Sequence, residues 1–420
     1  MLGVVGVETR KNYVIGVFTG MIVMMAVFIG IMVFFPGLLV GGRPSTLPRF
    51  NQNSAAQPSP AYPTIGSKVD DIIRILDMVH VTHIDMEEFS DQVFRAVVGI
   101  LNDPYSVYMN AEQFAAFMED AEGVYAGIGV QVTTDLDTGH IRVVVPFEGT
   151  PGQAAGMLPG DFITHVNGEA VKGGDFLSDA VRQLRGQAGT SVAVTFYRPS
   201  TGESFDVVIV REVITVPTVS HSMKDDNIGY LRITQFDRPT YPQFVEAFED
   251  LKRQGMQGMI IDLRNNPGGL LNVVNQITDL LVPEGIIVYT EDKQGRQVFT
   301  PSGPQQIDVP LLVLVNGQSA SASEVLSGAV RDHGVGQLVG TTTFGKGLVQ
   351  NIFQLADGSA LRVTMATYFT PNSVSIHGYG LTPDHEIDMD IELSVRLNQL
   401  TLEEDVQLKY AIDLMREMLR

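Results

Sequence analysis

The sequence of 420 residues predicts a multidomain α+β protein that begins with an N-terminal membrane helix. Three observations support this prediction. An apolar run covers residues 13–35, a strand-rich stretch with glycine turns begins near residue 124, and strands alternate with amphipathic helices after residue 213. A chain of this length exceeds one ordinary hydrophobic core, so we expect two or three globular domains.

Composition limits the chemistry that the chain can perform. A net charge of -20 without a local basic cluster argues against a nucleic-acid partner. The absence of cysteine excludes disulfides, a thiol nucleophile and cysteine-based metal sites. His80 and His83 have no third ligand nearby in the sequence, so we predict no metal site and no cofactor.

The first forty residues carry the membrane prediction. Tyr13 to Phe35 would form about 35 Å of helix, which is enough to cross a bilayer. Arg10 and Lys11 precede this run and would keep the N-terminus in the cytoplasm. A cleaved signal peptide is the alternative, but its apolar region would span only about 7 to 15 residues. We therefore assign residues 1–40 to a cytoplasmic stub and anchor, and the Pro/Ser-rich residues 41–66 to a tether.

Helical periodicity defines the next segment, residues 67–123. Apolar residues fall on one helical face between Val69 and Val79 and again between Val93 and Leu101. The turn at residues 102–106, NDPYS, ends the second helix because proline restricts the residue before it. Nothing in this segment predicts chemistry.

Short strands, hairpin turns and two short helices are predicted for residues 124–213. Gly127, Ile128, Gly129 and Val130 lead into a strand, and MLPGDFITHVNG follows at residues 157–168. Glycines let backbone N–H groups converge on a carboxylate, while a strand offers an open edge to an extended peptide. The two motifs together resemble the carboxylate-binding loop and central signature of PDZ domains. A small barrel that only packs is the alternative.

Strands and helices alternate in residues 214–390, which predicts an α/β domain. NNPGG at residues 265–269 joins a buried strand to a helix, where unpaired N–H groups can stabilise negative charge. A plain connection made by Pro267 and the two glycines is the alternative. NGQSASASE follows the next buried strand and places serines at a strand-to-helix transition, as for many nucleophiles. These serines fit neither the G-x-S-x-G elbow of α/β-hydrolases nor the S-x-x-K signature of penicillin-binding enzymes. The residues alone do not choose among Ser319, Ser321 and Ser323.

Lys346, between Gly345 and Gly347, is the best candidate base for such a serine. Apolar surroundings lower the pKa of a lysine and allow it to accept a proton. A solvated loop charge is the alternative, and it stays open at this point.

Six motifs, in order, resemble those of the carboxy-terminal processing peptidases, also called tail-specific proteases, of the serine-lysine type. They are LNDPYS, the PDZ signature, DLRNNPGG, SASASE, TFGKGLVQ and DGSALRVTMATYFTP, and the resemblance spans residues 67–386. It implies that residues 214–390 form a serine-peptidase core with a ClpP/crotonase-like α/β fold, preceded by a PDZ domain.

The resemblance also implies roles for individual residues. Ser321 would be the nucleophile, Lys346 the base and Gln350 the residue that orients the lysine. The oxyanion hole would combine the amide of Ala322 with that of Gly268 or Gly269. The peptide-binding residues would be Gly127, Ile128, Gly129 and Val130.

The implied activity is that of a membrane-anchored serine endopeptidase, which binds protein C-terminal tails through its PDZ domain and cleaves near the C-terminus. It would lie at the bacterial cell membrane as a single-pass protein with its catalytic domain outside the cytoplasm. Its partners would be protein substrates with accessible tails, the membrane, and a second copy in a homodimer. A catalytically silent PDZ scaffold is the alternative, although the intact Ser321, Lys346 and Gln350 argue against it. A crotonase-like acyl-transfer enzyme is disfavoured by the anchor and the PDZ signature.

Three further expectations concern geometry. Tyr105 occupies the histidine position of the family's DPHS turn, and we expect this change not to touch the Ser-Lys pair. Lys346 and Gln350 would be about 13 Å apart in a straight strand, so their cooperation requires a bend. Residues 391–420 predict a C-terminal helix whose apolar face must be covered by its own domain or by a partner subunit.

Overall fold

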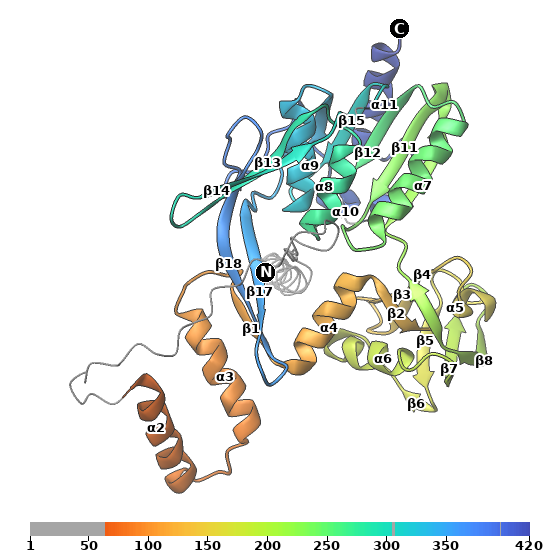
Figure 1. Ribbon diagram of the computed structural model, residues 1–420. Coiled ribbons are helices and arrows are strands. Elements are labelled where there is room, and N and C mark those ends of the chain that lie inside the picture. Colours follow the sequence, from red (N-terminus) through yellow and green to blue (C-terminus); the bar gives the residue numbers. More distant parts are fainter. Residues whose placement is uncertain (1–63, 305–306, 395) are drawn as a thin grey trace, which may run out of the picture.

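The computed structural model describes residues 64–304, 307–394 and 396–420, and Figure 1 shows their arrangement. The described chain contains a helical N-terminal segment, a small antiparallel domain and a larger α/β core. Each of the two globular parts has its own cluster of buried apolar side chains.

The predicted membrane helix requires a correction. The run from Tyr13 to Phe35, to which we assigned it, lies outside the described residues. Within the described part of the chain, no helix is long and apolar enough to cross a bilayer. The longest, α2 (Ile65–Val79), has 15 residues, whereas a spanning helix needs about 20. The corrected fold class of the described residues is therefore multidomain α+β, with no membrane-spanning helix among them.

The N-terminal segment contains α2, α3 (Met86–Gly99), β1 (Val107–Met109) and α4 (Ala111–Glu122). A polar side chain caps each helix at its start: Thr64, Asp85 and Asn110 accept backbone N–H groups of the first turn. β1 pairs with β18 of the core, with Val107 opposite Arg362. The N-terminal segment is therefore joined to the core by strand pairing.

The small domain is an antiparallel sheet with two short helices. Its strand order is β3-β4-β5-β7-β8, with β6 paired to β5. The bounds are β3 (Val130–Thr134), β4 (Ile141–Pro146), α5 (Pro151–Ala154), β5 (Phe162–Val166), β6 (Glu169–Ala170), η1 (Gly174–Phe176), α6 (Leu177–Leu184), β7 (Ser191–Arg198) and β8 (Glu203–Val210). β2 (Val124–Gly127) pairs with β9 (Glu212–Thr215) where the chain enters and leaves this domain.

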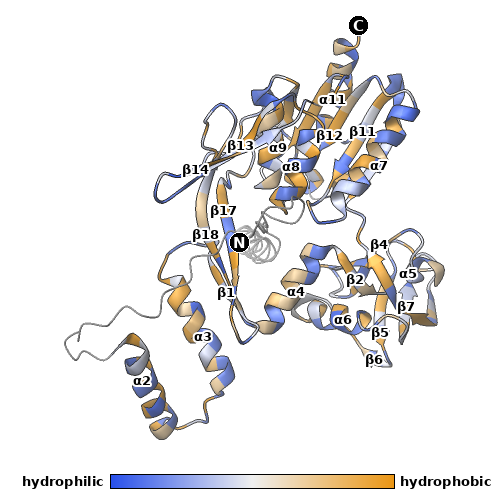
Figure 2. Ribbon diagram, viewed as in Figure 1, coloured by the Kyte–Doolittle hydropathy of each residue, from blue (hydrophilic) through white to orange (hydrophobic). Residues whose placement is uncertain are grey.

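The α/β core is built on a six-stranded sheet in the order β10-β11-β12-β15-β16-β19. All neighbours in it are parallel except β10 and β11. The strands are β10 (Val219–Lys224), β11 (Ile228–Ile233), β12 (Gly258–Asp262), β15 (Leu311–Val315), β16 (Gly336–Gly340) and β19 (His385–Glu386). Apolar residues gather along these strands (Figure 2), as expected for a parallel sheet covered on both faces.

Helices cover both faces of this sheet. α7 (Thr240–Arg253), α8 (Leu271–Asp279) and α9 (Ala322–Asp332) pack on the face that presents Met259 and Ile261. α11 (Val406–Met418) packs on the other face, against Ile260 and Leu312. The domain itself therefore covers Leu408, Ala411, Ile412 and Met415 of this helix, whereas Val406, Tyr410 and Met418 stay exposed. Short helices η2 (Asp225–Asn227), α10 (Ile391–Ser394) and η3 (Leu397–Gln399) complete the core.

A second, antiparallel sheet extends from the core. It consists of β1, β18 (Ala360–Phe369), β13 (Gly285–Asp292) and β14 (Gln297–Ser302), with β17 (Leu348–Gln354) also paired to β18. β17 begins at Leu348, shortly after Lys346 in the chain, so the predicted base lies at the start of this sheet.

Candidate active site

Two neighbouring strand ends bring the glycine turn and the serine cluster together. β12 and β15 are parallel neighbours, so the NNPGG turn and the SASASE run leave the same edge of the sheet. The carbonyl of Asn266 accepts the N–H of Ala320 at 3.0 Å. The N–H of Asn265 donates to Asn316 Oδ1 at 3.0 Å. The two connections are thus fastened to each other by hydrogen bonds.

The three serines of SASASE have different environments. Ser319 Oγ donates to the carbonyl of Leu263 at 2.8 Å, and Ser323 Oγ donates to the carbonyl of Asn266 at 2.9 Å. Both serines are fully buried and help to hold the glycine turn. Ser321 is 7% exposed, and its hydroxyl donates to no described group. The structure therefore leaves Ser321 as the serine with a free hydroxyl, a distinction that residue chemistry could not make.

Ser321 has a strained backbone. Its φ of 53° and ψ of -111° lie outside the regions that a residue with a side chain normally adopts. It is the N-cap of α9, so the N–H of Ala322 stands at the first helical position, where no intrahelical partner exists. The serine hydroxyl and a helix-start N–H are thus adjacent in the chain.

Gly268 of the glycine turn approaches Ser321 closely. A Cβ on Gly268 would lie 2.8 Å from Ser321 Cβ and 3.0 Å from the nitrogen of Ala322, and the φ of Gly268 is 107°. Its N–H donates to Asn266 Oδ1 at 2.9 Å. The N–H of Gly269 donates to no group in the described chain. Of the two predicted oxyanion amides, that of Gly269 is therefore unoccupied and that of Gly268 is engaged.

Glu324 is a site residue that the sequence reasoning missed. Its Oε2 accepts the N–H of Ser321 at 2.8 Å and the N–H of Lys346 at 2.9 Å. Its Oε1 accepts the Thr343 hydroxyl at 2.6 Å and the N–H of Gly345 at 2.7 Å. Burial raises the pKa of this carboxyl, while the hydrogen bonds oppose the rise. The sequence signal that could have identified Glu324 is a carboxylate in the first turn of an otherwise apolar helix.

Tyr368 of β18 is a second missed residue. Its hydroxyl oxygen lies 3.0 Å from the carbonyl of Ser321 and 2.5 Å from the carbonyl of Lys346. One phenol therefore shares its proton between the backbones of the predicted nucleophile and base. No local pattern marks this tyrosine, because its partners come from other elements.

Lys346 is 1% exposed. Burial is the largest cause that lowers its pKa, to about 7, and Arg362 adds to this effect. The carboxylates of Asp103 and Glu324 oppose it. Nζ donates to Gln350 Oε1 at 3.1 Å, and a β-bulge at Val349 and Gln350 supplies the bend that this contact needs. In the described part of the chain, Lys346 Nζ donates to Gln350 and makes no hydrogen bond with Ser321 Oγ.

Comparison with known proteins decides the family. The profile of peptidase family S41 matches residues 227–387, and that of the PDZ domain matches residues 142–198. The carboxy-terminal-processing protease of Bartonella bacilliformis is 36% identical over 339 residues, which cover 79% of this chain and 77% of that protein. This chain belongs to peptidase family S41.

Further relatives of this S41 peptidase agree with that assignment. The carboxyl-terminal-processing protease of Synechocystis is 35% identical over 324 residues, covering 76% of this chain and 75% of that protein. A crystal structure of a Bacteroides fragilis protein assigned to the S41 proteases shares the fold. Its TM-score is 0.53 at 16% identity, with 86% of this chain and all of that chain covered. The resemblance inferred from the six motifs is confirmed, and the chain is a serine peptidase of the carboxy-terminal processing type.

The expectation that Tyr105 would not touch the catalytic pair was wrong. Lys346 Nζ lies 4.9 Å from the centroid of the Tyr105 ring. The carbonyl of Tyr105 accepts Gln350 Nε2, although the two residues are 245 positions apart. The sequence could not show this contact, because pairing of β1 with β18 brings the turn to the lysine. The N-terminal segment of this S41 peptidase therefore contributes to its candidate site.

The predicted peptide-binding loop of the PDZ domain joins β2 to β3. Gly127 ends β2, Val130 begins β3, and Ile128 and Gly129 lie between them. Gly129 has a φ of 72° and lies against Thr150, so a side chain does not fit there. The backbone N–H groups of Ile128 and Gly129 donate to no group in the described residues. The loop thus keeps two adjacent donors available to a ligand.

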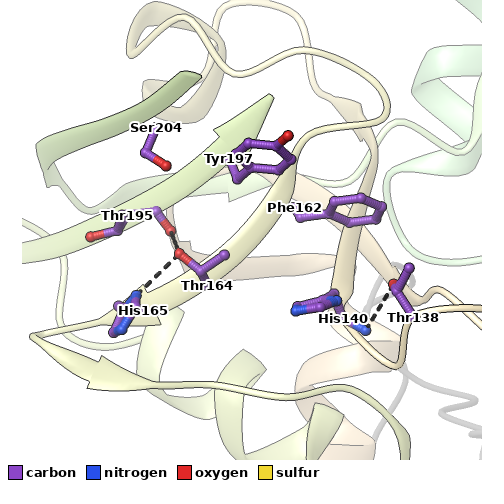
Figure 3. A pocket seen from close by; sticks show the side chains of 8 residues that line it. All are labelled: Thr138, His140, Phe162, Thr164, His165, Thr195, Tyr197 and Ser204. Carbon is purple, nitrogen blue, oxygen red and sulfur yellow. Dashed lines mark hydrogen bonds between the residues drawn. The ribbon is translucent and has the colours of Figure 1, made fainter. Parts of the chain in front are cut away.

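A pocket in the PDZ domain lies apart from these residues. Figure 3 shows side chains from β5, β7, β8 and the turn before β4 facing it. They are Thr138, His140, Phe162, Thr164, His165, Thr195, Tyr197 and Ser204. Thr164 Oγ1 donates to the carbonyl of Thr195 at 3.2 Å. None of the predicted site residues lines this pocket.

Proposed function

We propose that this S41 peptidase cleaves protein chains near their C-terminus with Ser321 as nucleophile and Lys346 as general base. One observation carries the proposal. The only SASASE serine with a free hydroxyl shares one carboxylate oxygen, Glu324 Oε2, with a buried lysine. Burial lowers the pKa of that lysine to about 7, which suits a general base near neutral pH.

The proposed reaction begins when neutral Lys346 takes the proton of Ser321 while Oγ attacks the scissile carbonyl. For this step Nζ must exchange its hydrogen bond to Gln350 Oε1 for one to Ser321 Oγ. The C–N bond then breaks, and the lysine ammonium returns its proton to the leaving amine. Water hydrolyses the resulting acyl-enzyme by the same proton transfers in reverse order.

The tetrahedral intermediate carries an oxyanion that needs backbone donors. The N–H of Ala322 follows the nucleophile directly, and the N–H of Gly269 is uncommitted. The N–H of Gly268 would become available only if Asn266 Oδ1 released it. We propose Ala322 together with an amide of the glycine turn as the oxyanion hole.

Substrate capture is assigned to the PDZ loop in this proposal. The adjacent free N–H groups of Ile128 and Gly129 suit a terminal carboxylate, and an extended tail would add to an edge strand. The matched test compares a peptide ending in a free carboxylate with the same peptide amidated at its C-terminus. We expect only the free acid to compete with a protein substrate. Equal competition by the amide would contradict carboxylate capture.

A location outside the cytoplasm and a homodimer stay predictions. α11 is covered by its own sheet on one side only. Val406, Tyr410 and Met418 of the same helix stay exposed and are available to a dimer interface.

The catalytic assignment is tested with Ser321→Ala and Lys346→Ala in the full chain. Cleavage of an unfolded protein with an apolar tail should be lost in both. Ser200→Ala and Lys252→Ala, at exposed positions, serve as matched controls and should retain turnover. A fluorophosphonate probe should label Ser321, as located by mass spectrometry. Turnover by either catalytic variant would contradict the Ser-Lys pair.

A further inference from the structure

The turn that carries Tyr105 is held rigidly beside Lys346. Asp103 Oδ1 accepts the N–H of Tyr105 at 3.0 Å, and Asp103 Oδ2 accepts the Ser106 hydroxyl at 2.5 Å. Ser106 Oγ in turn accepts the N–H of Thr364 on β18 at 3.1 Å. The turn is therefore fixed both internally and to the strand that lies next to β17.

This turn contacts Lys346 with the Tyr105 ring and Gln350 with the Tyr105 carbonyl. The Tyr105 ring presents its face to Lys346 Nζ, with 4.9 Å between Nζ and the ring centroid. The ring is only half-buried, whereas the lysine is 1% exposed. The phenol ring therefore separates the amine from solvent on this side. The Tyr105 carbonyl accepts Gln350 Nε2, which directs Gln350 Oε1 at Nζ.

The ring has two opposite effects on the lysine. Its negative face attracts the ammonium form by about 0.5–2 kcal/mol. By excluding water, it disfavours the same form, and dehydration of a buried amine lowers the pKa by up to about 3–5 units. Burial by the whole site is the largest cause that lowers the pKa of Lys346. We expect loss of the cover by the ring to outweigh loss of its attraction, so removal of the ring should make the amine easier to protonate.

Other charged and titratable groups also face this amine. Asp103 lies in the same turn, Glu324 on α9, and Arg362 and Tyr368 on β18. The two carboxylates favour the ammonium and the guanidinium disfavours it, while the Tyr368 hydroxyl is bonded to the lysine carbonyl. None of these groups is changed by a substitution at the Tyr105 side chain. The ring can therefore be tested separately from them.

We propose that Tyr105 is a positioning residue for Lys346: its ring keeps water from the amine, and its carbonyl holds Gln350 against that amine. The segment preceding the PDZ domain thereby completes the base of the peptidase. This inference rests on the proposed role of Lys346 as general base.

The experiment uses three variants of the full chain: Tyr105→Phe, Tyr105→Leu and Tyr105→Ala. All keep the backbone carbonyl that holds Gln350. The readout is the pH dependence of tail-peptide cleavage and of Ser321 labelling by a fluorophosphonate. Tyr105→Phe should match the parent, because it keeps the ring. Tyr105→Leu keeps an apolar side chain over the amine but removes the aromatic face. The rising limb of its pH–rate profile should therefore stay in place or move to lower pH.

Tyr105→Ala admits water, so its rising limb should move at least one unit to higher pH. At pH values below the rising limb, this shift corresponds to a tenfold or greater loss of rate. The rate should recover at high pH. An unshifted limb, or an equal loss at every pH, would overturn the inference. If Tyr105→Ala shows no unfolding transition in a thermal melt, Tyr105→Ser takes its place with the same expectation, because serine is favoured in turns.

Lys346→Ala in the same assays separates the two proposals. Activity of Lys346→Ala would contradict the proposed role of Lys346 as general base. An inactive Lys346→Ala together with an unshifted Tyr105→Ala would overturn only the role of Tyr105.

Discussion

Glu324 and Lys346 are joined by a hydrogen bond from the lysine backbone N–H to Glu324 Oε2, 2.9 Å long. The same oxygen accepts the N–H of Ser321 at 2.8 Å. A single buried carboxylate oxygen therefore holds the loops of the proposed nucleophile and base together. The side chains of Ser321 and Lys346 need not touch at rest, because the backbones of these two residues are already fixed relative to each other.

The first prediction concerns this carboxylate. In Glu324→Gln an NH₂ group replaces one oxygen and points at backbone donors, which leaves buried donors unpaired. We expect the free energy of unfolding to fall by about 1–3 kcal/mol and kcat to fall strongly, because the two loops separate. Urea unfolding and peptide cleavage measure these effects. Glu249→Gln, on the exposed side of α7, is the control and should change neither; normal kcat in Glu324→Gln would refute the role of the carboxylate.

The second prediction is the pH dependence of the parent enzyme. Lys346 acts as a base only when neutral, and the neutral fraction grows as pH rises through its pKa of about 7. The rate kcat/KM should thus rise about tenfold per pH unit below 7 and level off above it. Steady-state rates between pH 5 and 9 test this. A rise centred near pH 10 would indicate a solvated lysine instead.

The third prediction concerns the close approach of the glycine turn to the nucleophile. In Gly268→Ala the new Cβ would lie 2.8 Å from both Ser321 Cβ and the carbonyl oxygen of Ala320. We expect near-complete loss of cleavage and of fluorophosphonate labelling. Gly295→Ala is the matched control, since Gly295 has a φ of 75° but nothing within 4 Å of a new Cβ. It should lose only about 1–2 kcal/mol of stability and stay active; equal activity of the two variants would contradict the prediction.

The fourth prediction concerns the C-terminal helix. Arg264 Nη1 lies 2.7 Å from Oδ1 of Asp405, the N-cap of α11, and Arg264 also pairs with Asp262. Arg264 and Asp405 are almost fully buried. Asp405→Ala leaves part of a buried guanidinium unpaired and should cost about 3–5 kcal/mol, measured by urea unfolding. Asp413→Ala, which removes an exposed ion pair on the same helix, should cost less than about 1 kcal/mol. Similar losses in both variants would mean that the buried pair does not anchor α11.

The α/β core, the PDZ domain and the family follow from strand and helix periodicity and from six short motifs, all of which are local in the chain. The membrane helix was not borne out by the described residues. Lys346 was recognisable as a candidate base because apolar surroundings can lower the pKa of a lysine.

The sequence by itself determined the peptidase family, the order of domains and the short list of reactive residues. Only the tertiary structure decided which of the three serines has a free hydroxyl, which glycine amide is unoccupied, and that Glu324, Tyr368 and Tyr105 surround the pair. The physical reason is that these properties depend on hydrogen bonds between distant segments, such as Ser319 to Leu263 and Gln350 to Tyr105. Local patterns specify secondary structure, whereas strand pairing decides which of these segments meet.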